Sequence, residues 1–409
     1  MRIFFVALMF LAPLFAQQNI SLKNVAKELS DPAQATKPTI MSHTRKLLEP
    51  TQGLRDYQST PNSSLVQKLR DKKDLRIRIF GDSHIAGDFL SHRLRGLLFE
   101  SNALGFVYPL YPAYHQNIML KYENQNFEVL NSRKDDYEDY PLGGIVAKPL
   151  GLPAEIILTP KIELSKQTLT KIIFKSPNKK NTILIEDAAQ KRYSINAKHA
   201  FVWQAIELKL TYPVRIEMLN EKAVLGGYFI YQPKENNFVE NIGVNGARSD
   251  IWTKWDEKML MKQMSMLESD LVILCYGSND ALYDTFNKQA FLKNYGDLID
   301  KIRATNPKAS ILLLSPPTVV QKVATKKKRA QTTYKITKNF EPIKQSIHEL
   351  AQQKQTLLFD MDDFMNQSGG KQKWEEANLA KRDVHLLPIG YKLIADKLYY
   401  ELNKMGKGK

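Results

Sequence analysis

The pattern of apolar positions predicts an α/β fold over most of the chain. Continuous apolar runs of the kind found in strands buried on both faces of a sheet occur at residues 271–276, 311–314 and 357–359, and residues 75–80 predict a short apolar-rich strand that ends at Gly81. Apolar residues at spacings of three and four predict helices over residues 89–98, 291–302, 336–350 and 389–402. Strands that alternate with helices indicate a parallel sheet covered on both faces.

The stretch 105–238 has a different pattern and predicts a β-sandwich. Its short runs are rich in β-branched and aromatic residues, are separated by Pro, Asn and Gly, and lie at 155–159, 169–174, 182–185, 205–210, 214–218 and 224–231. Because this stretch follows the first strand–helix unit and interrupts the α/β pattern, we interpret it as an inserted domain. The α/β domain is then discontinuous, with residues 75–104 and 239–409.

The first 16 residues have the layout of a secretory signal peptide. Arg2 precedes an apolar run, and Ala16 stands before polar residues, so cleavage is expected after Ala16. Leu14 is larger than the residue usual at its position, which leaves an uncleaved anchor as the alternative. Residues 17–74 are polar and contain four spaced prolines, and we expect them to pack on the core as a lead-in. No later stretch is apolar enough to span a bilayer.

Length and composition narrow the possibilities further. A chain of 409 residues is too long for one ordinary core, and 43% hydrophobic with 25% charged residues is typical of a soluble globular protein. The net charge of +16 suits an acidic partner or reflects a general lysine bias. Because no nucleic-acid-binding motif is present, we expect no nucleic-acid partner. The single cysteine, Cys275, excludes an internal disulfide and a cysteine-ligated zinc site.

Two polar motifs follow predicted strands. Gly81-Asp82-Ser83-His84 ends the first strand, and Gly277-Ser278-Asn279-Asp280 follows the run 271–276. In open α/β sheets, ligands bind at this edge. A serine there stands at a helix N-terminus, whose free N–H groups favour negative charge, and an Asn side chain can donate to an oxyanion. Taken alone, the first motif is more typical of a plain helix N-cap, and the second is also typical of a turn.

Two further motifs complete a set. In Asp383-Val384-His385, just before the last helix, an extended backbone would point the acid and the imidazole the same way, so that the acid can orient the ring. Gly243-Val244-Asn245-Gly246-Ala247 contains glycines that allow close approach of backbone to a ligand.

In this order the four motifs resemble the SGNH hydrolase (GDSL esterase and lipase) family, over residues 75–104 and 239–404. The resemblance implies a flavodoxin-like three-layer α/β/α fold and a serine esterase mechanism. Ser83 would be the nucleophile, His385 the general base, and Asp383 the group that orients it. The N–H groups of Ser83 and Gly246 and the side chain of Asn279 would form the oxyanion hole. The family implies no metal and no cofactor.

Two departures from the family pattern narrow the resemblance. His84 replaces the usual Leu, and the Asp–His spacing is two instead of three. Both features are similar to the peptidoglycan O-acetylesterases of Gram-negative bacteria, which also share the length, the signal peptide and a carbohydrate-binding-module-like sandwich inserted after the first helix. This resemblance implies a periplasmic enzyme, expected to be a monomer. It would remove the acetyl ester from the C6 hydroxyl of N-acetylmuramic acid in O-acetylated peptidoglycan, and so affect wall turnover and cell shape.

Several alternatives stay open at this point. The same triad serves acetyl transfer between glycans and the hydrolysis of lipid or xylan esters. A non-catalytic wall-binding protein is a further alternative, in which the β-sandwich and the basic surface bind the wall. The basic run 326–329 could lie at the cleft or in a solvated loop. Aromatic and apolar residues that favour a core position over sugar binding are Trp252, Trp255, Met259, Leu260, Trp203, Tyr212, Tyr228 and Tyr231.

Overall fold

A computed structural model describes residues 21–407 except 101–102, 235 and 324–332, so the predicted signal peptide and the basic run 326–329 lie outside the described residues. The core is a six-stranded sheet in the order β1-β19-β16-β15-β2-β14. Its pairs are parallel except that of β1 with β19. The strands are β1 (Arg55–Asp56), β2 (Arg76–Gly81), β14 (Phe238–Gly243), β15 (Leu271–Cys275), β16 (Ser310–Ser315) and β19 (Leu357–Asp360).

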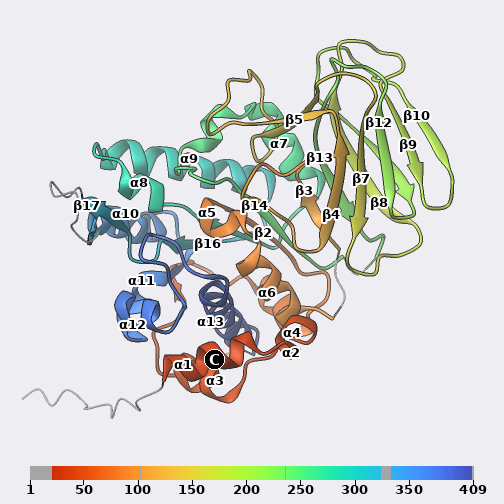
Figure 1. Ribbon diagram of the computed structural model, residues 1–409. Helices are drawn as coiled ribbons and strands as arrows, with labels where there is room; N and C mark the ends of the chain where they lie inside the picture. Colours follow the sequence, from red (N-terminus) through yellow and green to blue (C-terminus); the bar gives the residue numbers. More distant parts are fainter. Residues whose placement is uncertain (1–20, 101–102, 235, 324–332, 408–409) are drawn as a thin grey trace, which may run out of the picture.

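Helices cover both faces of this sheet (Figure 1), which confirms the predicted three-layer α/β/α fold. On one face lie α7 (Glu257–Met266), α9 (Lys288–Thr305) and α10 (Phe340–Gln353). On the other lie α6 (Phe89–Leu98), α11 (Met361–Gln367), α12 (Gly370–Glu376) and α13 (Pro388–Lys407). Two very short helices, α5 (Ser83–Ala86) and α8 (Ser278–Leu282), begin directly after β2 and β15.

The segment before β2 packs on the α13 side of the sheet. It forms α1 (Leu22–Ser30), α2 (Ala33–Thr36), α3 (Ser42–Leu48) and α4 (Ser63–Asp71). The fully buried ammonium of Lys397 in α13 donates to the carbonyls of Leu48 and Thr51, both at 2.9 Å. A buried Arg93–Asp396 pair joins α6 to α13, and the Arg93 side chain also donates to the carbonyl of Thr39.

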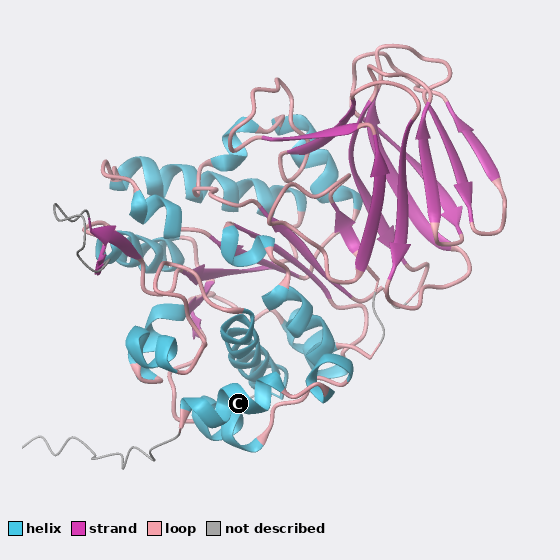
Figure 2. Ribbon diagram, in the orientation of Figure 1, coloured by secondary structure: helices cyan, strands magenta, loops and turns pink. Residues whose placement is uncertain are grey.

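Residues 105–231 form two antiparallel sheets that pack as a sandwich, seen at the upper right of Figure 2. One sheet has the order β11-β8-β13-β6-β5, with β3 also on β13, and the other the order β10-β9-β12-β7-β4. The strands are β3 (Gly105–Val107), β4 (Leu120–Gln125), β5 (Phe127–Asn131), β6 (Ile145–Pro149), β7 (Ala154–Pro160), β8 (Thr168–Lys175), β9 (Ile183–Asp187), β10 (Arg192–Ile195), β11 (Gln204–Leu210), β12 (Val214–Met218) and β13 (Val224–Tyr231).

The helix predicted over residues 336–350 starts too early. Residues Thr333–Ile336 form strand β18, which pairs with β17 (Val320–Val323), and α10 begins only at Phe340. The prediction failed because Ile336, which is 60% exposed, was counted as a core position of the helix.

Most aromatic residues considered for sugar binding are buried. Trp252, Trp255, Trp203 and Tyr228 are each less than a tenth exposed, as the core interpretation predicts, while Tyr212 and Tyr231 are partly exposed. Met259, Leu260 and Cys275 are buried as well. Within the described residues, no helix combines the length and apolar character needed to cross a membrane.

Candidate active site

Ser83 lies at the carboxyl edge of the central sheet, as its position after β2 predicts. Asp82 is the N-cap of α5, and its side chain accepts the N–H of His84 at 2.9 Å. Ser83 is therefore the first residue of the helix, and its own N–H has no acceptor among the described residues. Its side chain remains partly exposed, so a substrate can reach the hydroxyl.

Glycines allow this turn to sit so close to the sheet. A Cβ at position 243, at the end of β14, would lie 2.4 Å from the backbone N of Ala86 in α5. A Cβ at Gly81 would lie 2.8 Å from the carbonyl O of Cys275 on β15. Real Cβ atoms do not approach this closely, so both positions require glycine for α5 to hold its place.

His385 and Asp383 meet Ser83 although they lie about 300 positions away in the chain. The His385 Nε2 atom is 3.0 Å from Ser83 Oγ, and Nδ1 is 3.1 Å from Asp383 Oδ1. With Nδ1–H donating to the carboxylate, Nε2 is left to accept the serine hydroxyl. A hydroxyl, an imidazole and a carboxylate in series form the arrangement that activates a serine for acyl transfer.

The Asp383 carboxyl is held ionised by its neighbours. Partial burial alone would raise its pKa, but the backbone N–H of His385, which donates at 2.8 Å, and the imidazole together lower the pKa below its usual range. Lys371 of α12 donates to the carbonyls of Asp383 and Lys381 at 2.5 and 2.6 Å and so fixes the loop that carries the acid.

Asn279 and Gly246 come to the same edge of the sheet. Asn279, in α8, donates from its amide to the carbonyl of Ala247 at 2.9 Å and to Asp82 Oδ2 at 3.3 Å. Gly246 has φ +76°, and its N–H has no acceptor in the described part of the chain. The structure thus brings Ser83, His385 and Asp383 into contact and places Asn279 against Asp82, while Gly246 lies on the loop that follows β14, the strand paired with β2.

A buried polar network below the site was not predicted as such. The His84 ring, 3% exposed, lies between Tyr391 Oη at 3.0 Å and Ser278 Oγ at 2.8 Å. Burial lowers the pKa of His84 to about 3, so the ring is neutral. It lies 5.9 Å from the His385 ring and connects α5, α8 and α13. The only sequence signal for it was the replacement of Leu by His after the serine.

Two protein-family models match separate parts of the chain. Residues 224–393 match the GDSL-like lipase/acylhydrolase family, a range that contains Gly246, Asn279, Asp383 and His385 but not Ser83. Residues 103–215 match the N-terminal domain of peptidoglycan O-acetylesterase. Among curated proteins, no sequence matches the chain.

Among solved structures, one described as a peptidoglycan O-acetylesterase in action is similar over 87% of this chain and 99% of its own, with a TM-score of 0.74 and 25% identity. A family two carbohydrate esterase from Cellvibrio japonicus has 12% identity and a TM-score of 0.29 over 71% of this chain and 99% of its own. A carbohydrate-binding module from Cellvibrio mixtus lichenase 5A has 12% identity and a TM-score of 0.20 over 27% of this chain and 89% of its own. The chain therefore combines a GDSL/SGNH hydrolase domain with the N-terminal domain of peptidoglycan O-acetylesterases, in the fold of a solved enzyme of that kind.

Proposed function

We propose that the protein is a peptidoglycan O-acetylesterase that hydrolyses the acetyl ester on the C6 hydroxyl of N-acetylmuramic acid. The observation that carries the proposal is the Ser83–His385–Asp383 chain of contacts, at 3.0 and 3.1 Å, in a hydrolase domain joined to this particular N-terminal domain. The similarity to a solved peptidoglycan O-acetylesterase, which extends over nearly the whole chain, supports the choice of substrate.

In the proposed reaction, Ser83 attacks the acetyl carbonyl carbon while His385 takes the hydroxyl proton. The carbonyl oxygen becomes negatively charged, and the N–H groups of Ser83 and Gly246 donate to it. Asn279 joins them when its amide turns from Asp82, the longer of its two contacts, toward the oxyanion. His385 then protonates the sugar oxygen, which leaves as the free C6 hydroxyl, and the acetyl group stays on Ser83.

The second half of the proposed reaction releases acetate. His385 removes a proton from water, which attacks the acetyl-serine, and the same N–H groups stabilise the second tetrahedral intermediate. Proton return to Ser83 Oγ restores the enzyme. Side chains and backbone of this chain supply every group that these steps use, so the proposal includes neither a metal nor a cofactor.

We further propose that the protein acts as a monomer in the periplasm, with the O-acetylated glycan strand as its partner. Peptidoglycan lies outside the cytoplasmic membrane, and residues 1–16 have the pattern of an export signal. Fractionation of cells that express the full chain tests the location, and N-terminal sequencing of the exported protein tests cleavage after Ala16.

Two measurements test the activity. A fluorophosphonate probe is expected to label the wild-type protein and not the Ser83→Ala variant, and labelling that survives this substitution would remove Ser83 from the mechanism. Acetate release from O-acetylated muropeptides is expected to exceed release from acetylated xylan. Faster release from xylan would assign the enzyme to another carbohydrate, and recovery of the acetyl group on a second glycan instead of as free acetate would make it a transferase.

A further inference from the structure

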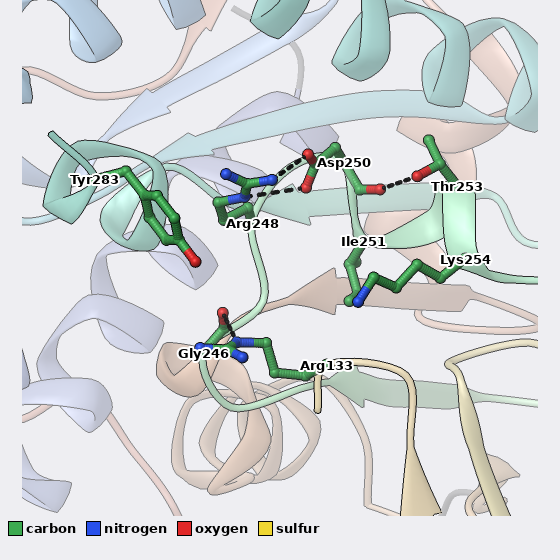
Figure 3. Close-up of a pocket in the computed structure, with 8 residues that line it drawn as sticks. All are labelled: Arg133, Gly246, Arg248, Asp250, Ile251, Thr253, Lys254 and Tyr283. Atoms are coloured by element: carbon green, nitrogen blue, oxygen red, sulfur yellow. Dashed lines mark hydrogen bonds and ion pairs between the residues drawn. The ribbon is translucent and has the colours of Figure 1, made fainter. Parts of the chain in front are cut away.

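A cationic pocket adjoins the proposed oxyanion hole (Figure 3). It has a volume of about 200 Å³ and is lined by Arg133, Gly246, Arg248, Asp250, Ile251, Thr253, Lys254 and Tyr283. Pockets for whole drug-sized ligands measure about 300–1,000 Å³. This pocket is therefore sized for one group of a larger substrate.

Both domains build the pocket, and two of its walls belong to the catalytic edge. Gly246, one of the proposed oxyanion donors, lines it directly. Tyr283 ends α8, the helix that carries Asn279. Arg133 comes from the β5–β6 connection of the sandwich and donates from Nε to the carbonyl of Gly246 at 2.9 Å. A group bound here would thus be held within the same loop cluster that surrounds the acetyl ester.

The pocket carries an excess of positive charge. Asp250 is its only acidic residue, and it is paired with Arg248 at 2.6 Å. Arg133 uses Nε for the bond to Gly246, and its two terminal nitrogens have no acceptor among the described residues. The ammonium of Lys254 likewise has no ion-pair partner among the residues that the structure describes. Two cations are therefore available to a ligand.

The geometry favours a carboxylate in this pocket. A guanidinium presents a planar pair of donors that matches the two oxygens of a carboxylate. Tyr283 is 46% exposed, and its ring centroid lies 4.5 Å from the Arg248 guanidinium. Figure 3 shows the Tyr283 hydroxyl directed toward the pocket, between Arg248 and Gly246. The pocket thus offers charge-assisted donors and an additional hydroxyl at one place.

We propose that the pocket binds a carboxylate of the substrate while the acetyl ester lies at Ser83, so that the enzyme prefers acetylated glycans that bear a nearby acid. This inference rests on the proposed function, because O-acetylated peptidoglycan carries such acids on its stem peptides and, where the peptide is missing, on the lactyl group. The pocket is then a determinant of specificity that separates this substrate from neutral acetylated polysaccharides.

The test compares kcat/KM for acetate release from three soluble O-acetylated muramyl substrates. The first bears a stem peptide with free carboxylates, the second bears the same peptide with its carboxylates converted to methyl amides, and the third has no peptide and a free lactyl carboxylate. The wild-type enzyme is expected to prefer a free carboxylate over the capped peptide by about threefold to tenfold, the value of one charge-assisted hydrogen bond near the surface. Preference for the first substrate assigns the pocket to peptide carboxylates, and preference for the third alone assigns it to the lactyl group.

Substitutions at Lys254 link that preference to the pocket. Lys254→Gln is expected to bring the ratio between free and capped substrates closer to one, and Lys254→Glu to lower it further. Lys258→Gln, which removes an exposed charge outside the pocket, is the matched control and is expected to keep the wild-type ratio. A wild-type ratio of one, or the same ratio in all four proteins, would overturn the inference while leaving the esterase intact. If the wild-type protein releases no acetate from any of the substrates, the proposed function itself fails.

Discussion

The carboxyl group beside the nucleophile gives a quantitative test of the site. Asp82 is 1% exposed and accepts the N–H of His84 at 2.9 Å and the amide of Asn279 at 3.3 Å. Burial raises the pKa of Asp82 to about 7 against these hydrogen bonds, with a smaller contribution from the negative charge of Asp280. The residue that caps α5 is therefore costly to ionise in the folded chain.

The size and sign of the effect follow from the two pKa values. The difference between the ordinary value of 3.8 and about 7 corresponds to about 4 kcal/mol. Because the folded chain binds this proton more tightly than the unfolded chain, the stabilisation is complete below about pH 4 and is lost as the pH rises to about 7. Asp82 thus lowers the free energy of unfolding over this interval by an amount of that order.

Asp82→Asn removes the titration and keeps an oxygen for the N–H of His84. We expect the free energy of unfolding of the variant, relative to that of wild type, to increase by about 2–4 kcal/mol between pH 4.5 and pH 7.5. Urea unfolding followed by tryptophan fluorescence at the two pH values measures this difference. Because every other titrating group is present in both proteins, its contribution cancels when the variant is compared with wild type. Asp256→Asn, at the partly exposed N-cap of α7, controls for the amide substitution itself. If wild type and Asp82→Asn respond to pH in parallel, the carboxyl titrates normally and our account of its burial is wrong.

Three further substitutions test other parts of the structure. Asn279→Ala is expected to lower kcat for acetyl-ester hydrolysis by about 10²–10³-fold, measured with p-nitrophenyl acetate, because it removes one oxyanion donor. Gly243→Ala is expected to cost about 1–3 kcal/mol in urea unfolding and to lower kcat, since the new Cβ would lie 2.4 Å from the backbone of α5. Glu240→Gln is expected to cost about 3–5 kcal/mol, because it leaves the fully buried guanidinium of Arg78 without its counter-charge.

Matched substitutions give the Gly243→Ala and Glu240→Gln predictions a control. Gly151→Ala places a Cβ where no atom lies within 4 Å and should leave both stability and kcat unchanged. Glu123→Gln breaks the exposed pair with Lys121 and should cost less than about 1 kcal/mol. Equal costs for Glu240→Gln and Glu123→Gln would contradict the role given to burial. A loss of kcat below about tenfold in Asn279→Ala would remove its side chain from the oxyanion hole.

The sequence predicted the central strands that are rich in apolar residues and missed the two-residue strand β1 and strand β14. The runs at β15, β16 and β19 contain almost only apolar residues, β2 alternates apolar residues with two arginines, and each is a buried strand of the central sheet. Strand β14 is just as buried, but it contains Glu240 and Asn241. Glu240 pairs with Arg78 on β2, and Asn241 donates to the carbonyl of Ile85 in α5 at 2.9 Å. Since their partners come from distant segments, no local pattern could show that these polar residues are satisfied inside a sheet.

The same reasoning explains which parts of the site were predictable. Ser83 and Asn279 follow strands, so their place on the sheet edge depends only on local order along the chain. Asp383 and His385 were found by their spacing and by the family resemblance, and the contact of His385 with Ser83 depends on the loop that Lys371 holds. The ring of His84 became part of the site through contacts with two other segments, for which the sequence offers no periodicity or spacing.

The position of Arg133 shows most clearly what required the structure. Its bond to the carbonyl of Gly246 joins two domains across 113 positions, and it exists because the β5–β6 connection is fixed against the segment that follows β14. Trp255 of that segment donates from its indole to Ser132 Oγ at 3.0 Å, and a Cβ at Gly144 would lie 2.2 Å from the same indole nitrogen. A tryptophan at helical spacing predicts a buried position and gives no partner for its N–H. The pocket beside the oxyanion loop thus depends on how one buried indole holds the sandwich against the hydrolase domain, and substitution of Trp255 by Phe should loosen Arg133 from Gly246 without removing any group that lines the pocket.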